Sequence, residues 1–317
     1  IYDFDLMIDD KLQSVTDEMA ISVLNEEFSD FVIYPYEYNL KYHINRIVLP
    51  VFVQKSDLSK KSFMRILPKY YDGVAAFVLD KQYEKEIYKK LNNLPERMVM
   101  IVNEYADELL LEIKRYVAVK YFYSMRDEFK KDDPTVEKEL TLYLEEQKSI
   151  VSELIHDWRD IKSNGIYVLS KGDEKAINTG VELSRVTSEI MFEAYPDTII
   201  VNNDLVNKNS VTGAIKLARL KALNYIMNDE DILENCPLLS PEHTIIRSVL
   251  SKNGIHDDGT VSKKNKFSNG TDAGQPVCKI INRYLNKCIN GQVSLQELYE
   301  QLKKPPFGLR DGYISIL

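Results

Sequence analysis

The chain has 317 residues, of which 44% are hydrophobic and 28% are charged, and its formal net charge at pH 7 is −8. This composition is typical of a globular protein, and the length is sufficient for two or three packed units. No run of about 18 apolar residues is present, so we expect no membrane-spanning helix. Three cysteines without close spacing, Cys236, Cys278 and Cys288, argue against a disulfide framework. A reducing compartment fits this pattern, and we expect a cytoplasmic protein.

The charges are unevenly distributed along the chain. Residues 1–39 contain ten acids and one lysine, whereas residues 260–288 contain six Lys or Arg and the single acid Asp272. Such asymmetry can orient a polyanion or an acidic partner, although salt screens charges beyond about 10 Å. A solvated surface explains the same pattern.

Short apolar runs alternate with polar helical stretches over residues 1–104. The predicted elements are a helix at 15–28, strands at 31–33, 47–53, 73–79 and 98–102, and a helix at 81–91. The order strand, helix, strand between residues 73 and 102 is typical of a βαβ unit, in which the two strands are parallel. We therefore expect a small α/β domain over residues 1–104.

Two long stretches with apolar residues at helical spacing follow, Tyr105–Phe129 and Pro134–Lys162. Asp133 and Pro134 predict the start of the second helix, because an N-cap carboxylate accepts from unpaired amides and proline has no amide to leave unpaired. A short polar link between two such stripes predicts an antiparallel, coiled-coil-like hairpin over residues 105–162. At 1.5 Å per residue, each arm would be about 40 Å long.

The remaining residues, 163–317, show mostly helical patterns. The predicted elements are a strand at 165–170 and helices at 179–194, 210–227, 240–254, 276–290 and 295–303. Ser294 and Glu297 form a capping-box pattern, in which a hydroxyl and a carboxylate each accept from an unpaired amide. We expect a C-terminal domain that is either plainly helical or winged-helix-like. The whole chain is therefore predicted to be α+β and mainly helical.

The sequence contains no common catalytic or metal-binding motif. A GxxxxGK[ST] loop is absent, the four histidines are scattered, and no Ser or Cys lies in a nucleophile-elbow pattern. Asp80 follows an apolar run as the acid of a Walker B strand does, but many ordinary strands also end in Asp. The helix at 210–227 carries Lys216 and Arg219 and no acid. This pattern is typical either of a lid helix that contacts a nucleotide or of a solvated helix face.

Basic residues gather in and beside a polar stretch at 256–275, which we predict to be a loop. They are Lys263, Lys264, Lys266, Lys279, Arg283 and Lys287. Clustered cations are sufficient for contact with a phosphate backbone, so DNA or RNA binding is an alternative function. A metal-dependent hydrolase, with carboxylates outside any familiar motif, is a third.

Several groups of residues occur in an order that resembles a known family. They are Asp132-Asp133-Pro134-Thr135-Val136, then Leu183-Ser184-Arg185-Val186, Ala194-Tyr195-Pro196 and Val201-Asn202-Asn203-Asp204-Leu205, and last Pro305-Pro306-Phe307-Gly308-Leu309-Arg310-Asp311-Gly312. This order resembles the region beyond the ATPase core in large bacterial P-loop ATPases, including those of phage-exclusion (BREX-type) defence operons. The resemblance extends over most of residues 45–317.

The resemblance implies that Walker motifs lie upstream of Ile1 in a larger protein, which would bind ATP and Mg²⁺ there. This chain would then need no cofactor of its own. The resemblance does not identify binding residues. We expect Phe307 and Arg310 to lie either at an interface or simply at a helix start, because Pro and Gly preset turns without any ligand.

We therefore expect a non-catalytic regulatory or interaction module of an anti-phage ATPase. Its partners would be other proteins or further copies of itself. Nucleic acid remains the alternative partner, and no membrane contact is expected.

Overall fold

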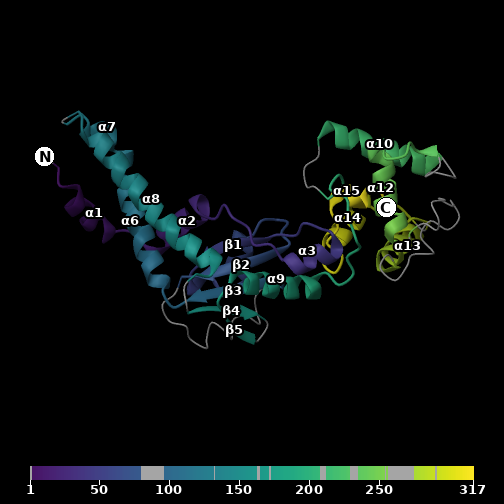
Figure 1. The fold of residues 1–317 in the computed structure, drawn as a ribbon, viewed down its shortest axis with the longest axis horizontal. Coiled ribbons are helices and arrows are strands. Elements are labelled where there is room, and N and C mark those ends of the chain that lie inside the picture. The colour runs from purple at the N-terminus through teal and green to yellow at the C-terminus, as the bar shows by residue number, and fades with distance from the viewer. Residues whose placement is uncertain are drawn as a thin grey trace. The chain divides into compact units, whose positions relative to one another are not determined.

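The computed structural model describes residues 2–79, 96–131, 133–162, 165–170, 173–207, 212–228, 235–253, 255, 275–289 and 291–317. Its helices and its five-stranded sheet confirm the predicted α+β, mainly helical fold (Figure 1). Within these ranges, every helix is too short or too polar to cross a bilayer. The chain forms two compact units, Ile1–Tyr34 with Ile47–Thr187 and Pro35–Arg46 with Ser188–Leu317. The boundaries that we expected after residues 104 and 162 both fall inside the first unit.

The sheet belongs to the first unit and has the strand order β1-β2-β3-β4-β5. Its strands are β1 (Val48–Val53), β2 (Gly73–Val78), β3 (Met98–Asn103), β4 (Ile166–Ser170) and β5 (Asp173–Ile177). The first three are parallel, and the strand-helix-strand pattern predicts this for β2 and β3. The pairs β3–β4 and β4–β5 are antiparallel. Every residue of β2 and β3 is buried, because parallel strands are usually covered on both faces.

Two parts of the sheet differ from the prediction. Residues 31–33 form no strand, and Ile33 makes only an isolated bridge to Val48. The sequence pattern does not predict β5, because Asp173-Glu174-Lys175 lacks apolar alternation and the strand depends on its pairing with β4. The predicted helix at 81–91 lies outside the described residues.

The helices of the first unit include both arms of the predicted hairpin. They are α1 (Phe4–Leu12), α2 (Asp17–Glu27), α4 (Lys60–Ile66), α6 (Ala106–Ser124), α7 (Arg126–Phe129) and α8 (Val136–Asp160), with a 3₁₀ turn, η1, at Lys55–Asp57. The arms α6 and α8 lie side by side (Figure 1), and Gln147 of α8 donates to the Glu112 carbonyl of α6 at 3.1 Å. Positions 112 and 147 lie at similar distances along the chain from the link. The two helices are therefore antiparallel, and the hairpin is confirmed.

The second arm begins two residues later than predicted. Its first helical residue is Val136, and Thr135 is the N-cap. The Asp133 carboxylate accepts from the Thr135 amide at 2.9 Å and from the Thr135 hydroxyl at 2.8 Å. These hydrogen bonds lower the pKa of Asp133. They form a local turn that keeps Pro134 outside the helix.

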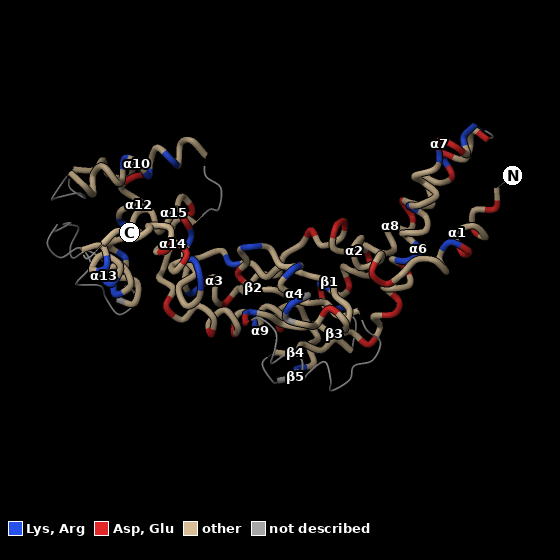
Figure 2. Tube along the Cα trace, turned by 180° about the vertical axis from the view of Figure 1, so that it is seen from behind, with Lys and Arg blue, Asp and Glu red and all other residues tan. Residues whose placement is uncertain are grey.

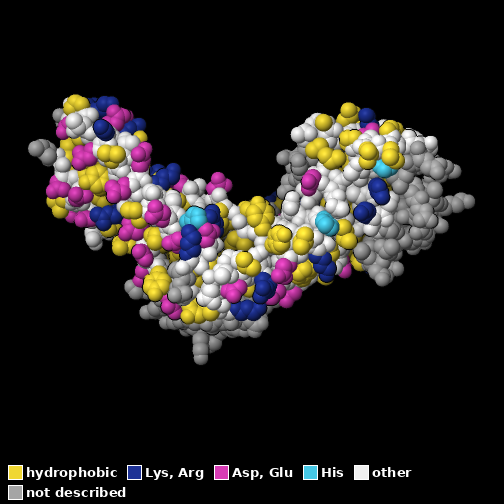
Figure 3. Space-filling view, in the orientation of Figure 1, with side chains coloured by type: hydrophobic (Ala, Val, Ile, Leu, Met, Phe, Trp, Pro, Cys, Tyr) yellow, Lys and Arg dark blue, Asp and Glu magenta, His cyan; other side chains and the backbone are white. Residues whose placement is uncertain are grey.

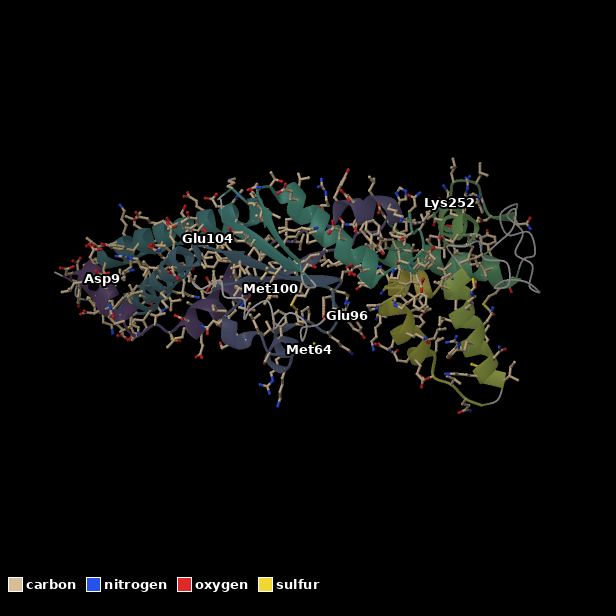
Figure 4. All side chains as sticks on the ribbon, turned by 90° about the horizontal axis from the view of Figure 1, so that it is seen from below. Asp9, Met64, Glu96, Met100, Glu104 and Lys252 are labelled. Atoms are coloured by element: carbon tan, nitrogen blue, oxygen red, sulfur yellow. The ribbon has the colours of Figure 1, made fainter. Side chains whose placement is uncertain are left out.

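The two faces of the sheet pack against different elements. One face joins Met100 of β3 and Phe63 of α4 in one apolar cluster. Figure 4 shows α4, marked by Met64, beside the strand that carries Met100. On the other face, the ring centroid of Phe77 lies 5.9 Å from that of Trp158 in α8. The hairpin is thus anchored to the sheet by the end of α8.

Acids of the N-terminal segment pair with cations of α6. Figure 2 marks the positions of Asp and Glu in red and of Lys and Arg in blue along the chain trace. The ion pairs are Asp9 with Arg115, Asp17 with Lys114 and Glu27 with Lys120. In addition to these ion pairs, Phe4 and Ile8 of α1 share an apolar cluster with Phe122 and Leu140 of the hairpin. Several acids of residues 1–39 therefore form ion pairs within the unit, and a charge count along the chain does not reveal this.

The described elements of the second unit are helical. They are α3 (Tyr36–Tyr42), α10 (Gly213–Asn228), α12 (Pro241–Val249), a 3₁₀ turn η2 (Ser251–Asn253), α13 (Gln275–Ile289), α14 (Leu295–Lys303) and α15 (Asp311–Ile314), while α9 (Gly180–Ala194) contains the boundary between the units. The Ser294 hydroxyl caps α14, as predicted, and the Ser240 hydroxyl caps α12. The helix expected to reach residue 254 ends at Val249, and η2 follows it. No strand occurs among the described residues of this unit, so its plainly helical form is the one observed.

The core of the second unit surrounds Arg46, which is completely buried. Its guanidinium carbon Cζ lies 3.7 Å from the ring centroid of Tyr195. Its Nη2 donates to the Thr198 hydroxyl at 3.0 Å and to the Phe307 carbonyl at 3.3 Å. A buried cation is costly unless hydrogen bonds and an aromatic face replace its water. Arg46 therefore ties the segment before β1 to the C-terminal helices of its unit.

Candidate interaction surface

Helix α10 is apolar on two sides. Its Ala, Leu, Lys and Arg residues are good helix formers, and no acid interrupts them. One side packs within the unit through Ile215, Ala218, Ala222 and Ile226. These positions are spaced by three or four residues, as one buried helix face requires. The opposite side would normally be polar.

The opposite side of α10 instead exposes large apolar side chains. Leu217 is 54% exposed, Leu220 55% and Met227 70%. We call these three residues the α10 stripe. Positions 217, 220 and 227 fall on one side of a helix with 3.6 residues per turn. Figure 3 shows hydrophobic side chains gathered over α10.

Two lysines border the α10 stripe. Lys216 and Lys221 are both exposed and lie on either side of it by helical spacing. The Lys221 ammonium lies 3.8 Å from the carboxylate of Glu242, in the first turn of α12. The border of the stripe is therefore cationic, although one cation is shared with the neighbouring helix.

A second exposed apolar pair lies just before α12. Leu238 is 78% exposed and Leu239 is 86% exposed. Leu239 also has a φ of +64°, a left-handed conformation that a residue other than glycine rarely adopts. Because Lys221 contacts the first turn of α12, this pair lies at the end of α12 that faces α10. The two leucines add exposed apolar surface at that end of α12.

Of the residues predicted to contact a nucleotide, the structure describes Lys216 and Arg219, and their surroundings differ. Lys216 is exposed, whereas Arg219 donates from Nη2 to the Leu205 carbonyl at 3.2 Å. The Arg219 guanidinium also lies against Gly312, where an added Cβ would be 1.9 Å from Nη2. Burial lowers the pKa of Arg219, and the nearby Asp311 carboxylate opposes that shift. Asp80 lies outside the described residues.

The residues predicted at an interface take part in the packing of the second unit. Phe307 is buried, and its carbonyl accepts from Arg46 and from the Thr198 hydroxyl. Arg310 is the N-cap residue of α15 and donates to the Asn45 carbonyl at 3.3 Å. The turn at 305–312 and helix α10 meet at Gly312, a contact that the sequence does not predict.

The predicted nucleic-acid residues divide into two groups. Lys279, Arg283 and Lys287 are exposed along α13, whereas Lys263, Lys264 and Lys266 lie outside the described residues. A metal site was not predicted. Within the described ranges, no three His, Cys, Asp or Glu side chains come together as metal ligands would.

The α10 stripe itself was missed at the sequence level. The available signal was that Leu217, Leu220 and Met227 continue the apolar character of the helix beyond one face. No protein-family model, curated protein or solved structure matches this chain. Its function is therefore inferred from the surfaces of α10 and α13.

Proposed function

We propose that this chain is a non-catalytic interaction module that binds an acidic amphipathic helix of a partner protein through the α10 stripe. The observation that carries this proposal is the exposure of Leu217, Leu220 and Met227 between two lysines. A helix of this kind can receive the apolar side of a second helix, as many helix-recognition surfaces do.

The apolar side chains of the α10 stripe and the lysines beside it contribute differently to such a complex. Covering a half-exposed leucine contributes about 1 kcal/mol, so the α10 stripe supplies several kcal/mol before the costs of association. Lys216 and Lys221 lie at the edge, where charges mainly guide encounter and select partners of opposite sign. The partner helix therefore carries Asp or Glu beside its apolar residues.

The larger context follows from the family resemblance. We propose that the parent protein is a cytoplasmic P-loop ATPase of bacterial phage defence and that ATP and Mg²⁺ bind upstream of this chain. The chain then senses a partner or transmits its binding. The resemblance in residue order supports this assignment, and an exposed binding helix is the kind of feature that a transmitting segment needs.

The absence of catalysis is tested by ATP hydrolysis. The purified chain is expected to release no phosphate from ATP above background, with or without Mg²⁺. The Asp80→Ala variant is expected to give the same background. Hydrolysis that Asp80→Ala abolishes would overturn the non-catalytic assignment.

The binding surface is tested with two synthetic amphipathic helices that share the same leucines. One carries Glu beside the leucines and the other carries Lys. Calorimetry is expected to show binding of the Glu peptide and weaker or no binding of the Lys peptide. Leu217→Ser combined with Leu220→Ser is expected to weaken binding about tenfold or more, from the apolar area that is lost.

A matched control uses two exposed leucines of the hairpin. Leu111 and Leu142 are 53% and 58% exposed. Leu111→Ser combined with Leu142→Ser removes the same apolar groups from another surface and is expected to leave peptide affinity unchanged. An equal loss of peptide affinity in both double variants would assign the binding to non-specific hydrophobic association and not to α10.

A further inference from the structure

Helix α13 has a face that carries positive and neutral polar side chains and no acid. The helix contains no Asp or Glu in its 15 residues. Val277, Cys278 and Ile281 are buried and define the side that packs within the unit. At 100° per residue, the opposite side carries five exposed residues, which are Lys279, Asn282, Arg283, Asn286 and Lys287. The partly buried Pro276 lies on this side in the first turn.

The three cations of this face are evenly spaced. Lys279, Arg283 and Lys287 follow one another at intervals of four residues, which separates neighbours by about 6 Å along the helix. Among the described residues, none of the three forms an ion pair with a carboxylate. Their charge is therefore directed to solvent, and we call them the α13 cationic face.

We propose that the α13 cationic face binds the phosphate backbone of a nucleic acid. Three cations in a row over about 12 Å can contact successive phosphates, which lie close together along a strand. Asn282 and Asn286 lie beside the three cations on the same exposed side of the helix. This proposal is independent of the α10 stripe.

The composition of the face favours nucleic acid over an anionic membrane. An interfacial membrane helix needs apolar side chains next to its cations, so that they enter the lipid together. The exposed apolar residues of α13, Leu285 and Ile289, lie on the flank of the helix and not among the three cations. The overall charge of −8 acts mainly at longer range, where salt screens it beyond about 10 Å.

The decisive measurement is the salt dependence of binding. A fluorescent duplex DNA and a single-stranded DNA of mixed sequence are titrated with the full chain at several salt concentrations. For about three phosphate contacts, the slope of log K against log salt is expected to be about −2.7 on the duplex and about −2.1 on the single strand. Non-specific binding of this kind has dissociation constants of about 10⁻⁴ to 10⁻⁶ M at physiological salt, so low salt is used first.

The variant that tests the face is Lys279→Gln with Arg283→Gln and Lys287→Gln. Its salt slope is expected to approach zero, and its affinity at low salt is expected to fall at least about tenfold. The matched control is Lys131→Gln with Lys138→Gln and Lys148→Gln, three exposed lysines of the first unit. Both variants lose three positive charges, so a general effect of net charge would appear in both. Circular dichroism establishes that both remain helical.

Three results would overturn the proposal. The first is no binding to either DNA at low salt. The second is an equal loss in the α13 variant and the control, which would assign binding to net charge. The third is binding to phosphatidylserine vesicles, with no binding to DNA, that the α13 changes abolish. That last result would assign the face to a membrane surface instead.

Discussion

The side-chain amide nitrogen of Asn253 lies 2.7 Å from the hydroxyl of Tyr313, although the two residues are 60 positions apart in the chain. Both are buried. The Tyr313 hydroxyl in turn donates to the Val249 carbonyl at 3.2 Å, and Asn253 also pairs with both backbone groups of Ile200. One polar cluster therefore joins η2, α12, α15 and the segment after α9 within the second unit.

Removing the Tyr313 hydroxyl is expected to destabilise this unit. Tyr313→Phe keeps the ring but leaves the Val249 carbonyl without this donor, and the expected loss is about 1 to 2 kcal/mol. Urea denaturation, monitored by circular dichroism, measures this loss in the free energy of unfolding. Tyr105→Phe is the control, because Tyr105 is 56% exposed. Equal midpoints for the two variants would show that the cluster contributes no net stability.

The buried Arg46 is expected to be essential for the second unit. Arg46→Ala removes the hydrogen bonds to Thr198 and Phe307 and the contact with the Tyr195 ring, and it leaves a cavity. The expected loss in the free energy of unfolding is about 3 to 5 kcal/mol. Arg310→Ala, at a partly exposed position, is expected to cost about 1 kcal/mol. Thermal denaturation of both variants checks the difference, and a similar loss in both would contradict the role given to Arg46.

Gly308 is expected to tolerate no side chain. Its φ is +61°, and an added Cβ would lie 2.5 Å from the Tyr195 ring and 2.6 Å from Nη2 of Arg46. Gly308→Ala should therefore cost about 2 to 4 kcal/mol from backbone strain and overpacking. At Gly213, where nothing lies within 4 Å of an added Cβ, alanine is expected to be neutral or slightly stabilising. Melting temperatures that fall equally in both variants would refute the packing argument.

Glu27 makes the contact between α2 and α6 sensitive to acid. Burial raises the pKa of Glu27, but hydrogen bonds from Lys120 and Tyr116 outweigh this effect and lower the pKa overall. A carboxylate whose pKa is lower in the folded state stabilises the protein above its unfolded pKa of about 4.3. That stability is lost as the pH falls through the lower folded value.

The melting temperature as a function of pH tests this linkage. Glu27→Gln is expected to melt below the unchanged protein at pH 6, with the difference shrinking below about pH 4. Glu146→Gln, an exposed position on α8, is the control and is expected to follow the unchanged protein. A difference that stays constant from pH 6 to pH 3 would mean that Glu27 acts through packing alone.

Much of the fold could be predicted from local pattern. The period of apolar residues in α6 and α8 predicts the hairpin, and a short link leaves the antiparallel arrangement as the simple solution. The serines before α12 and α14 predict two helix starts through their own backbone contacts. The parallel order of β2 and β3 follows from the spacing between them.

The candidate surfaces were predicted only in part. Lys216 and the α13 cations are visible in the sequence because charge is a property of the residue itself. The α10 stripe is not, since leucines in a helix are normally buried and the sequence does not state which side packs. In the same way, Phe307 belongs to a turn that could face solvent or the core, and the structure places it in the core.

The sequence by itself determined the two long helices of the hairpin and the parallel pair β2 and β3, because neighbouring residues along the chain supply those signals. Only the tertiary structure decided that Arg46 is buried against Tyr195, that the acids of α1 and α2 pair with α6, and that β5 joins the sheet. The first two depend on contacts between segments far apart in the chain. The third depends on pairing with the neighbouring strand β4, which the side chains of residues 173–175 do not signal. The free energy of these contacts cannot be read from the pattern of neighbouring residues in the sequence.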